Sequence, residues 1–315
     1  MRAIVVQDFG APPLLTELPR PEPAPNEVLV HVLGSSVNAL DLAIAAGMMR
    51  EGIGYTLPLV LGRDFAGVVE GLGSQVTRFR YGDEAFGFIA LPRLQGSWAD
   101  FITLPQDAIV STKPAGLDFV QAGALPLAGL TGMLGFEAVD PKPGDVVLIV
   151  GATGGVGSYA TQLAKAHGVT VIATAKPEEE GYVRGQGAAE TVDYSTRDVA
   201  AAVRERHPGG IQGLIDLVNR TPEGFAKLAE LVADGGGVAS SLGAANVEEL
   251  AKRNVRASNL ASSAADAEVL HRLAIHVEEG HVTPPIGRVY PLRDAPQGMD
   301  DFRKGTLGKL ALALG

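Results

Sequence analysis

Short apolar runs alternate with turn-forming residues through the first 118 residues of the chain. Four such runs are Ala3–Val6, Glu27–Val37, Phe65–Gly73 and Asp100–Pro105, and proline and glycine separate them. Runs of this length, bounded by turn residues, are typical of β-strands. The pattern therefore predicts a β-rich segment that closes like a barrel rather than stacking in layers.

Strand and helix patterns alternate regularly in the next part of the chain. Val146–Val150, Val169–Ala175 and Gly213–Val218 read as apolar strands, and Gly157–Gly168 and Pro222–Ala233 as helices. Strands that are apolar throughout and flanked by helices belong to a parallel sheet covered on both faces. The pattern predicts a doubly wound α/β domain.

The last part of the chain holds one long helical pattern and two short strand-like runs, too little for a core of its own. They are Ala264–Gly280, Ile286–Leu292 and Gly308–Leu314. We expect this tail to return to the first domain and complete it. The predicted domains are residues 1–118 with 263–315, and residues 119–262.

A glycine-rich stretch, GATGGVGS at Gly151–Ser158, joins the first apolar strand of the α/β domain to its helix. Read as G-x-G-x-x-G, it has Ala152 in place of the first glycine, then Gly154 and Gly157. In this fingerprint the second glycine lets the backbone approach a pyrophosphate, and the third lets helix and strand pack closely. The helix N-terminus attracts the phosphates. No lysine follows Gly157, which disfavours a nucleoside triphosphate loop. The stretch predicts a dinucleotide site.

The end of the second strand indicates which dinucleotide is bound. A site for NAD usually has Asp or Glu there, bonded to the ribose 2′-hydroxyl. This chain has Thr174, Ala175 and Lys176 instead. The absence of a carboxylate and the presence of a lysine favour NADPH. The acids Glu178–Glu180 follow, and they also suit the start of a helix.

Composition and charge exclude several classes of function. The net charge is −10, without a basic cluster, so a nucleic-acid partner is not expected. The chain has no cysteine, which excludes disulfides and cysteine-ligated zinc. Of the six histidines, none has a metal-binding spacing, and His271 and His276 lie on different helix faces, so no metal is expected. No apolar run approaches the ~18 residues of a membrane span. Without a signal peptide pattern, we expect a cytoplasmic protein.

Several motifs of the chain belong together. They are Ser35–Gly47 with its V-N-x-x-D motif, Pro58–Phe88 with Gly62, Asp64, Gly67, Gly82 and Asp83, the stretch GSWADFITLP, the stretch KPAGLDFVQAGALPLAGLTG, and the glycine turn with its flanks. These motifs together resemble the medium-chain dehydrogenase/reductase superfamily, in its zinc-independent quinone oxidoreductase branch. The resemblance spans nearly the whole chain and implies a GroES-like barrel domain joined to a Rossmann domain.

The resemblance also implies a set of cofactor-binding residues. Three have ordinary alternatives: Asn38 could form a turn, Thr131 could bond its own helix, and Tyr194 could be a strand-end aromatic. The implied residues are Asn38, Thr131, Ala152, Thr153, Gly154, Gly155, Val156, Thr174, Lys176, Tyr194, Val218, Asn219, Ser241 and Leu242.

The implied reaction is hydride transfer from NADPH to a quinone or an α,β-unsaturated carbonyl. Some members of the branch carry a tyrosine where this chain has Gly47-Met48-Met49. Tyr55 lies a few residues on and is the candidate proton donor, with Asn38 as a possible catalytic contact. Two alternatives remain open, an enoyl-thioester reductase and a non-catalytic NADPH-binding protein. The resemblance further implies a homodimer through an edge strand at Asn254–Ser262.

Overall fold

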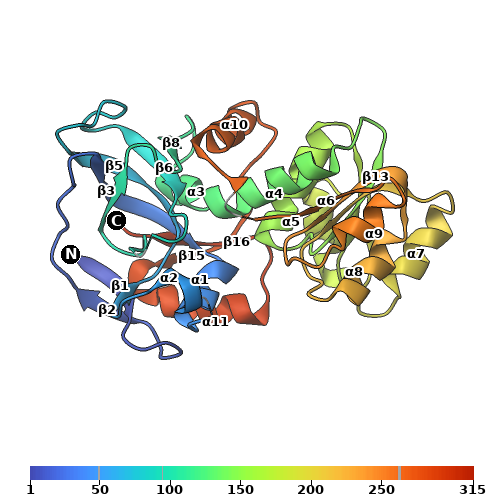
Figure 1. The fold of residues 1–315 in the computed structure, drawn as a ribbon, viewed down its shortest axis with the longest axis horizontal. Helices are drawn as coiled ribbons and strands as arrows, with labels where there is room; N and C mark the ends of the chain where they lie inside the picture. Colours follow the sequence, from blue (N-terminus) through green and yellow to red (C-terminus); the bar gives the residue numbers. More distant parts are fainter. Residues whose placement is uncertain (49, 94, 262–263) are drawn as a thin grey trace. The chain divides into compact units, whose positions relative to one another are not determined.

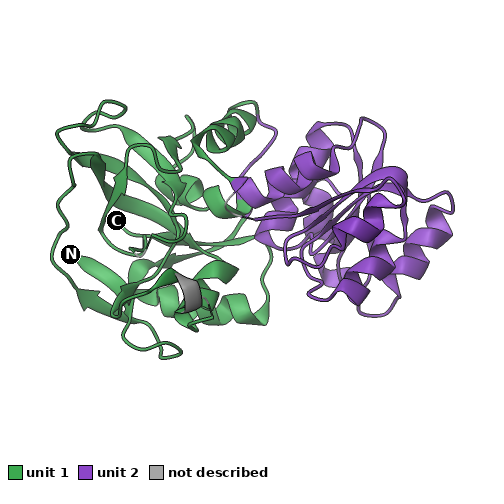
Figure 2. Ribbon diagram, viewed as in Figure 1, with its two compact units in different colours: residues 1–128, 265–279, 286–315 green, residues 129–264, 280–285 purple. Residues whose placement is uncertain are grey.

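The computed structural model describes residues 1–48, 50–93, 95–261 and 264–315, without the side chains of residues 51 and 52. The chain divides into two compact units (Figure 2). Unit 1 comprises Met1–Ala128, Ala265–Glu279 and Ile286–Gly315, and unit 2 comprises Gly129–Ala264 and Gly280–Pro285. The first division thus falls ten residues beyond position 118, and the tail is shared between both units.

Unit 1 is built on two sheets (Figure 1). The larger runs β15-β16-β3-β5-β6-β8, with β7 also paired to β3, and the smaller runs β2-β1-β4. The strands are β1 (Arg2–Val6), β2 (Leu14–Glu17), β3 (Glu27–Val37), β4 (Leu59–Val60), β5 (Asp64–Leu72), β6 (Glu84–Phe88), β7 (Phe101–Pro105), β8 (Val110–Thr112), β15 (Ile286–Pro291) and β16 (Lys309–Ala313). The helices are α1 (Ala39–Ala45), α2 (Arg50–Ile53), α3 (Phe119–Gly123), α10 (Ala267–Glu278) and α11 (Ala295–Lys304).

The C-terminal strand joins the middle of the unit 1 sheet. β16 pairs antiparallel with β3, so that Leu310 lies opposite Val37 and Ala311 opposite Ser36. This register brings Lys309 beside the end of β3, although the two are far apart in sequence. Apolar side chains of β3, β5 and β16 then meet in one buried core with Trp98.

Unit 2 is a six-stranded parallel sheet of order β11-β10-β9-β12-β13-β14. Numbered along the chain, this is the order 3-2-1-4-5-6 of dinucleotide-binding domains. The strands are β9 (Val146–Val150), β10 (Thr170–Thr174), β11 (Glu190–Val192), β12 (Ile211–Asp216), β13 (Val232–Ser240) and β14 (Arg256–Asn259). The helices are α4 (Pro126–Val139), which begins in unit 1, α5 (Gly155–Ala166), α6 (Glu180–Gln186), α7 (Val199–Arg206), α8 (Pro222–Ala229) and α9 (Val247–Ala251).

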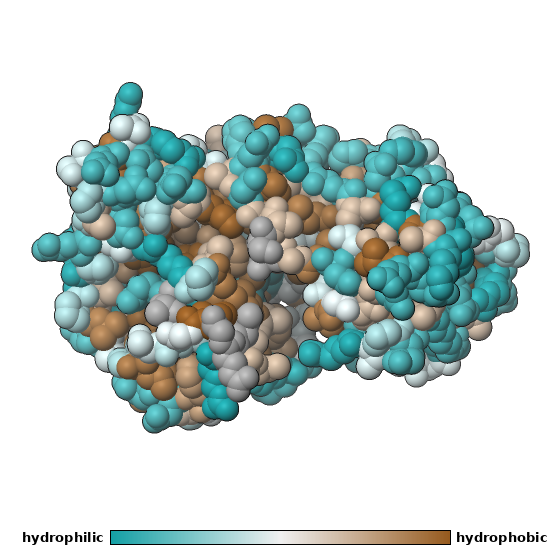
Figure 3. Space-filling view, in the orientation of Figure 1, coloured by the Kyte–Doolittle hydropathy of each residue, from teal (hydrophilic) through white to brown (hydrophobic). Residues whose placement is uncertain are grey.

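Helices cover both faces of this sheet, with α5 and α6 on one side and α7, α8 and α9 on the other (Figure 1). Their inward residues are apolar, including Leu163 on α5 and Phe225 on α8. The outward surface over α7 is mostly hydrophilic (Figure 3). This division between an apolar and a polar face is what a helix on one side of a sheet requires. Within the described residues, no helix is both long and apolar enough to cross a bilayer.

The strand predicted at Gly213–Val218 lies two residues earlier, at Ile211–Asp216. The Asp216 carboxylate accepts the backbone N–H groups of Val218 and Asn219, which turns these two residues out of the strand. The sequence patterns also missed α1, α2, α6, α9 and α11.

Candidate functional site

The glycine turn after β9 has the backbone geometry of a phosphate-binding loop. Gly151 adopts a φ of 84°, in the left-handed region that favours glycine. A Cβ at Gly157 would lie 2.3 Å from the Gly151 carbonyl oxygen, so only glycine permits this packing of α5. The tight turn is thus made by Gly151, one position before Ala152.

The space in front of α5 is open at Gly154, the N-cap of that helix. A Cβ there would have only the Gly151 carbonyl oxygen within 4 Å, at 3.6 Å. The first N–H groups of a helix have no partner within the helix and favour an anion. The turn from Ala152 to Val156 therefore fits a pyrophosphate that approaches the Gly154 backbone closely.

Thr174 braces this turn from the neighbouring strand. Its hydroxyl accepts the Gly151 N–H at 3.1 Å, and its side chain is buried. Ser158 on the first turn of α5 bonds Tyr182 of α6 at 2.9 Å, a contact that the sequence patterns did not reveal. The glycine turn is therefore held by its own glycines and by two flanking elements.

The acids that follow β10 are engaged by local donors. The Lys176 N–H donates to the Glu179 carboxylate at 2.9 Å. Glu180 accepts from Arg184 at 2.8 Å and from Thr191 at 3.2 Å. Hydrogen bonding to Arg184, then to Thr191, lowers the pKa of Glu180. Two of the three glutamates beside Lys176 thus have nearby partners.

Further along the same edge, buried polar groups shape the ends of β12 and β13. Asp216 is fully buried, and its second oxygen accepts the Asn219 side-chain amide at 2.6 Å. The Ser241 N–H donates to the Asp216 carbonyl at 3.0 Å, which ties the two strand ends together. Asp216 therefore orients Asn219, and the sequence patterns had not singled it out.

The structure gathers the implied cofactor residues of unit 2 at one edge of the sheet. They follow the carboxyl ends of β9 to β13, where α/β domains bind ligands. Three are exposed apolar side chains, Tyr194 at 47%, Val218 at 54% and Leu242 at 39%. Thr131 lies on α4, and a Cβ at the next residue, Gly132, would be 2.9 Å from the Val156 carbonyl oxygen. That close approach places Thr131 near the first turn of α5.

In unit 1, Asn38 belongs to a buried polar network. Its amide nitrogen donates to Asp64 at 2.8 Å, and its amide oxygen accepts from Lys309 at 2.6 Å. Ser36 donates to the same Asp64 oxygen at 2.6 Å. The other Asp64 oxygen accepts the Leu127 N–H at 2.8 Å, at the start of α4. Both ends of the Asn38 amide are thus held by other side chains.

Asp41 and Lys309 are charged groups within this core. The Asp41 carboxylate accepts the Asn38 N–H at 2.8 Å and caps α1. Burial, together with the nearby Asp64 carboxylate, raises the pKa of Asp41 to about 7. Burial lowers the pKa of Lys309, and the charges of Asp64 and Asp41 oppose that shift. The network therefore contains a carboxyl group whose pKa is near neutral.

Tyr55, the candidate proton donor, packs at the edge of the unit 1 core. Its ring makes an edge-on contact with Phe9, with centroids 6.3 Å apart. Its hydroxyl is buried and has no hydrogen-bond partner among the described residues. Burial raises the pKa of Tyr55, so the hydroxyl stays protonated at neutral pH. Met49, the nearby departure from the family pattern, lies outside the described residues.

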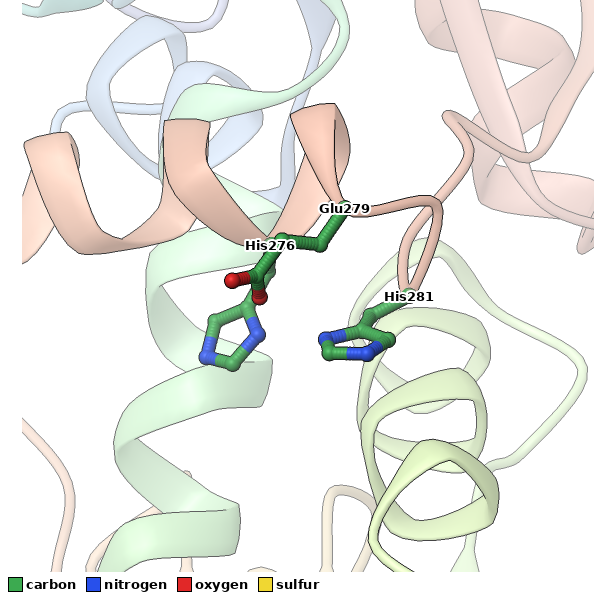
Figure 4. Close-up of side chains that lie close together, drawn as sticks. All are labelled: His276, Glu279 and His281. Carbon is green, nitrogen blue, oxygen red and sulfur yellow. The ribbon is translucent and has the colours of Figure 1, made fainter.

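Three metal-ligating side chains cluster around the end of α10, where no metal was expected. The ligand atoms of His276, Glu279 and His281 all lie within 4.8 Å of one another (Figure 4). Gly280 has a φ of 75° just after the helix, a reversal common at helix ends. The helical spacing of histidines could not reveal a group formed across that turn.

Comparisons with known proteins agree with this architecture. Residues 24–114 match the family model of the alcohol dehydrogenase GroES-like domain, and residues 186–312 match the zinc-binding dehydrogenase model. Quinone oxidoreductase of Sus scrofa is 31% identical over an alignment of 329 positions, which covers 100% of this chain and 98% of that protein. The chloroplastic NADPH-dependent alkenal/one oxidoreductase of Arabidopsis thaliana is 30% identical over 296 residues, covering 91% and 72%. The solved quinone oxidoreductase of Coxiella burnetii is 30% identical with a TM-score of 0.90, covering 100% and 99%.

The fold class is therefore confirmed as α/β, with a GroES-like domain and a Rossmann domain with a parallel sheet. With these relatives, the two-unit architecture defines an oxidoreductase of the dehydrogenase and reductase class. The chain belongs to the medium-chain dehydrogenase/reductase superfamily, in its quinone oxidoreductase-like branch.

Proposed function

We propose that this protein transfers hydride from NADPH to a quinone or an α,β-unsaturated carbonyl compound, without zinc. The observation that carries the proposal is the glycine turn of Gly151, Gly154 and Gly157, which follows β9 where the strand order reverses. Membership of the quinone oxidoreductase-like branch supports the same reaction class.

The residues at the carboxyl edge of the unit 2 sheet would hold the cofactor. The backbone from Ala152 to Val156 would bind the pyrophosphate, and Tyr194, Val218 and Leu242 would pack against its apolar parts. When bound, the cofactor supplies the hydride. The protein's own contribution is to position the two reactants and exclude water.

NADPH is the proposed form of the cofactor because no carboxylate follows β10 directly and Lys176 lies there. Glu179 and Glu180 are bonded to neighbouring groups, which weakens their repulsion of a 2′-phosphate. Lys176→Ala should raise KM for NADPH about tenfold, the loss of one ion pair, and leave KM for NADH nearly unchanged. Lys252→Ala, at the exposed residue that follows α9, is the matched control. Equal effects on both cofactors would contradict the NADPH assignment.

On the substrate side, we propose that Tyr55 donates the proton. We further propose that Asn38 positions Asp64 and Lys309, the two side chains to which its amide is hydrogen-bonded. Tyr55→Phe should lower kcat by a factor of about 10² because a positioned acid contributes 10²–10⁴. Asn38→Ala should cost stability as well, since the amide links Asp64 and Lys309. Unchanged kcat in Tyr55→Phe would exclude this proton donor.

The decisive experiment follows the loss of reduced-nicotinamide absorbance with a panel of quinones, enones and crotonyl-type thioesters. Turnover of quinones or enones is the expected result. Turnover of thioesters alone would indicate an enoyl-thioester reductase. Binding of NADPH without turnover of any acceptor would indicate a non-catalytic protein.

Zinc independence is tested on the same reaction. The absence of cysteine motivates it, and the His276, Glu279 and His281 group makes metal analysis necessary. Activity should survive dialysis against EDTA, and His276→Ala should behave like the wild type. Activity that disappears with EDTA and returns with Zn²⁺ would refute the proposal.

A homodimer through β14 is proposed as the assembly, and a cytoplasmic location stays a prediction. β14 is the last strand at one edge of the sheet, and symmetric pairing would cover that edge. The strand covers Arg256–Asn259, and Ser262 of the predicted strand lies outside the described residues. Sedimentation at micromolar concentration should give a dimer, and Ala257→Pro should give a monomer because proline cannot donate in a paired strand. A monomeric wild type would contradict this assembly.

A further inference from the structure

Arg63 is a buried cation that the proposed reaction has not yet used. It lies between Gly62, whose φ is 93°, and Asp64 at the start of β5, and its exposed fraction is 1%. A Cβ at Gly62 would lie 2.2 Å from Trp98, so the backbone before Arg63 is tightly packed. One guanidinium nitrogen, Nη1, donates to the Arg93 carbonyl oxygen at 2.7 Å. Arg63 is therefore fixed both at its backbone and at its guanidinium group.

The other edge of the guanidinium has no partner among the described residues. Nε and Nη2 are both buried and both lack a hydrogen bond there. Their N–H bonds point the same way and form the side of the guanidinium that binds oxygen atoms in a two-pronged fashion. Charged donors are seldom buried with unmet hydrogen-bonding capacity, because the loss of water is not compensated.

Three further buried polar atoms of unit 1 lack a partner among the described residues. They are Asp41 Oδ1, the Tyr55 hydroxyl and Arg93 Nε. Arg63 interacts electrostatically with Asp41 and Tyr55. Asp41, Tyr55 and Arg63 come from three places in the chain: α1, the segment after α2, and the position just before β5. The folded chain thus brings a cation, an acid and a hydroxyl together without pairing their free atoms.

The charges of this region favour a neutral ligand over an anion. Arg63 and Lys309 supply two positive groups, and Asp41 and Asp64 supply two acids. A ligand with a permanent carboxylate would add a third acid to the cluster. A carbonyl oxygen enters uncharged and gains negative charge only while the reaction proceeds. Such charge is what a preorganised donor stabilises most effectively.

We propose that the Nε and Nη2 edge of Arg63 binds the carbonyl oxygen of the acceptor and stabilises the negative charge that develops there. As the acceptor carbon gains the hydride, the conjugated electron pair shifts onto the oxygen bound by Arg63. The acceptor then takes one proton from the Tyr55 hydroxyl, and water returns a proton to Tyr55. The acceptor gains two electrons and two hydrogens in total, and the dihydronicotinamide loses two electrons. This inference rests on the proposed function and identifies the side chain that activates the acceptor's carbonyl group.

The test compares Arg63→Lys and Arg63→Met with the wild type on a series of substituted enones of graded reactivity. Arg63→Lys keeps the positive charge but loses the two parallel N–H donors of the guanidinium group, so kcat should fall about tenfold. Arg63→Met should lose about 10²–10³ in kcat, as for loss of an oxyanion donor. In both variants, kcat should depend more steeply on the intrinsic reactivity of the enone than it does in the wild type, while the affinity for NADPH stays the same. Arg78→Lys, a surface arginine of the same unit, is the control.

A measurement on the wild type keeps the test valid where a variant does not fold. In the presence of NADP⁺, acetophenone, whose neutral carbonyl oxygen accepts a hydrogen bond, should bind about tenfold more tightly than ethylbenzene, which lacks that oxygen. Intact Trp98 fluorescence would report that each variant is folded. Arg63 variants with wild-type kcat and wild-type acceptor dependence would overturn the inference while the proposed function stands. Failure of the wild type on every acceptor would instead refute the proposed function.

Discussion

Replacing Asp41 with asparagine should change how stability depends on pH. Asp41 is fully buried, and one of its oxygens has no partner among the described residues. The side-chain oxygen of asparagine can still accept the Asn38 N–H and cap α1. The substitution therefore keeps the cap and removes an ionisable group whose charged form is disfavoured by burial.

The direction follows from the pKa shift. The pKa of Asp41 rises from 3.8 to about 7 on folding, so the folded state holds the proton more tightly and loses stability as the pH rises between these values. At about 1.4 kcal/mol per unit, ionisation of the folded protein costs on the order of 4 kcal/mol above pH 7. At pH 5, which is about one pH unit above the ordinary pKa of 3.8, the loss of folding stability is on the order of 1.5 kcal/mol.

Between about pH 5 and pH 8, the wild type should therefore lose about 2 to 3 kcal/mol more stability than Asp41→Asn. Urea unfolding followed by Trp98 fluorescence measures this difference. Trp98 is the only tryptophan and is buried in unit 1, so it reports the unit that contains Asp41. Asp107→Asn, an exposed acid of the same unit, controls for the change in net charge. Parallel pH profiles for wild type and Asp41→Asn would refute the reasoning.

Three other substitutions test the packing of the two units. Lys309→Met should destabilise unit 1 by about 3 to 5 kcal/mol, because it leaves Asp64 buried without its cation, and a loss below 1 kcal/mol in urea unfolding would contradict this. Gly157→Ala should prevent the close packing of α5 on Gly151, so NADPH should no longer raise the melting temperature of this variant. A rise in melting temperature as large as in the wild type would contradict this. Asp216→Ala should raise KM for NADPH about tenfold by releasing Asn219, whereas unchanged kinetics would show that the turn holds without it.

The α/β unit was the more predictable part of the fold because its information is local. β9, β10 and β12 contain apolar runs, and each strand from β9 to β13 is followed by its own turn and helix. The glycines after β9 indicate the phosphate turn without knowledge of distant residues. The errors are also local: the prediction carried β12 two residues too far because apolar Leu217 and Val218 continue the run after Asp216. Only the folded turn shows that the Asp216 carboxylate ends the strand.

The polar core of unit 1 could not be predicted from such patterns, because its members come from distant segments. Lys309 and Asn38 are 271 positions apart and meet only through the pairing of β16 with β3. Asp41 and Arg63 look like ordinary surface residues in the sequence, since charged residues are rarely buried. Their burial follows from the sheet register, which places the ends of β3, β5 and β16 together. Such a site is therefore found by searching the described residues for buried polar atoms without a partner. Arg63 contributes two of these atoms.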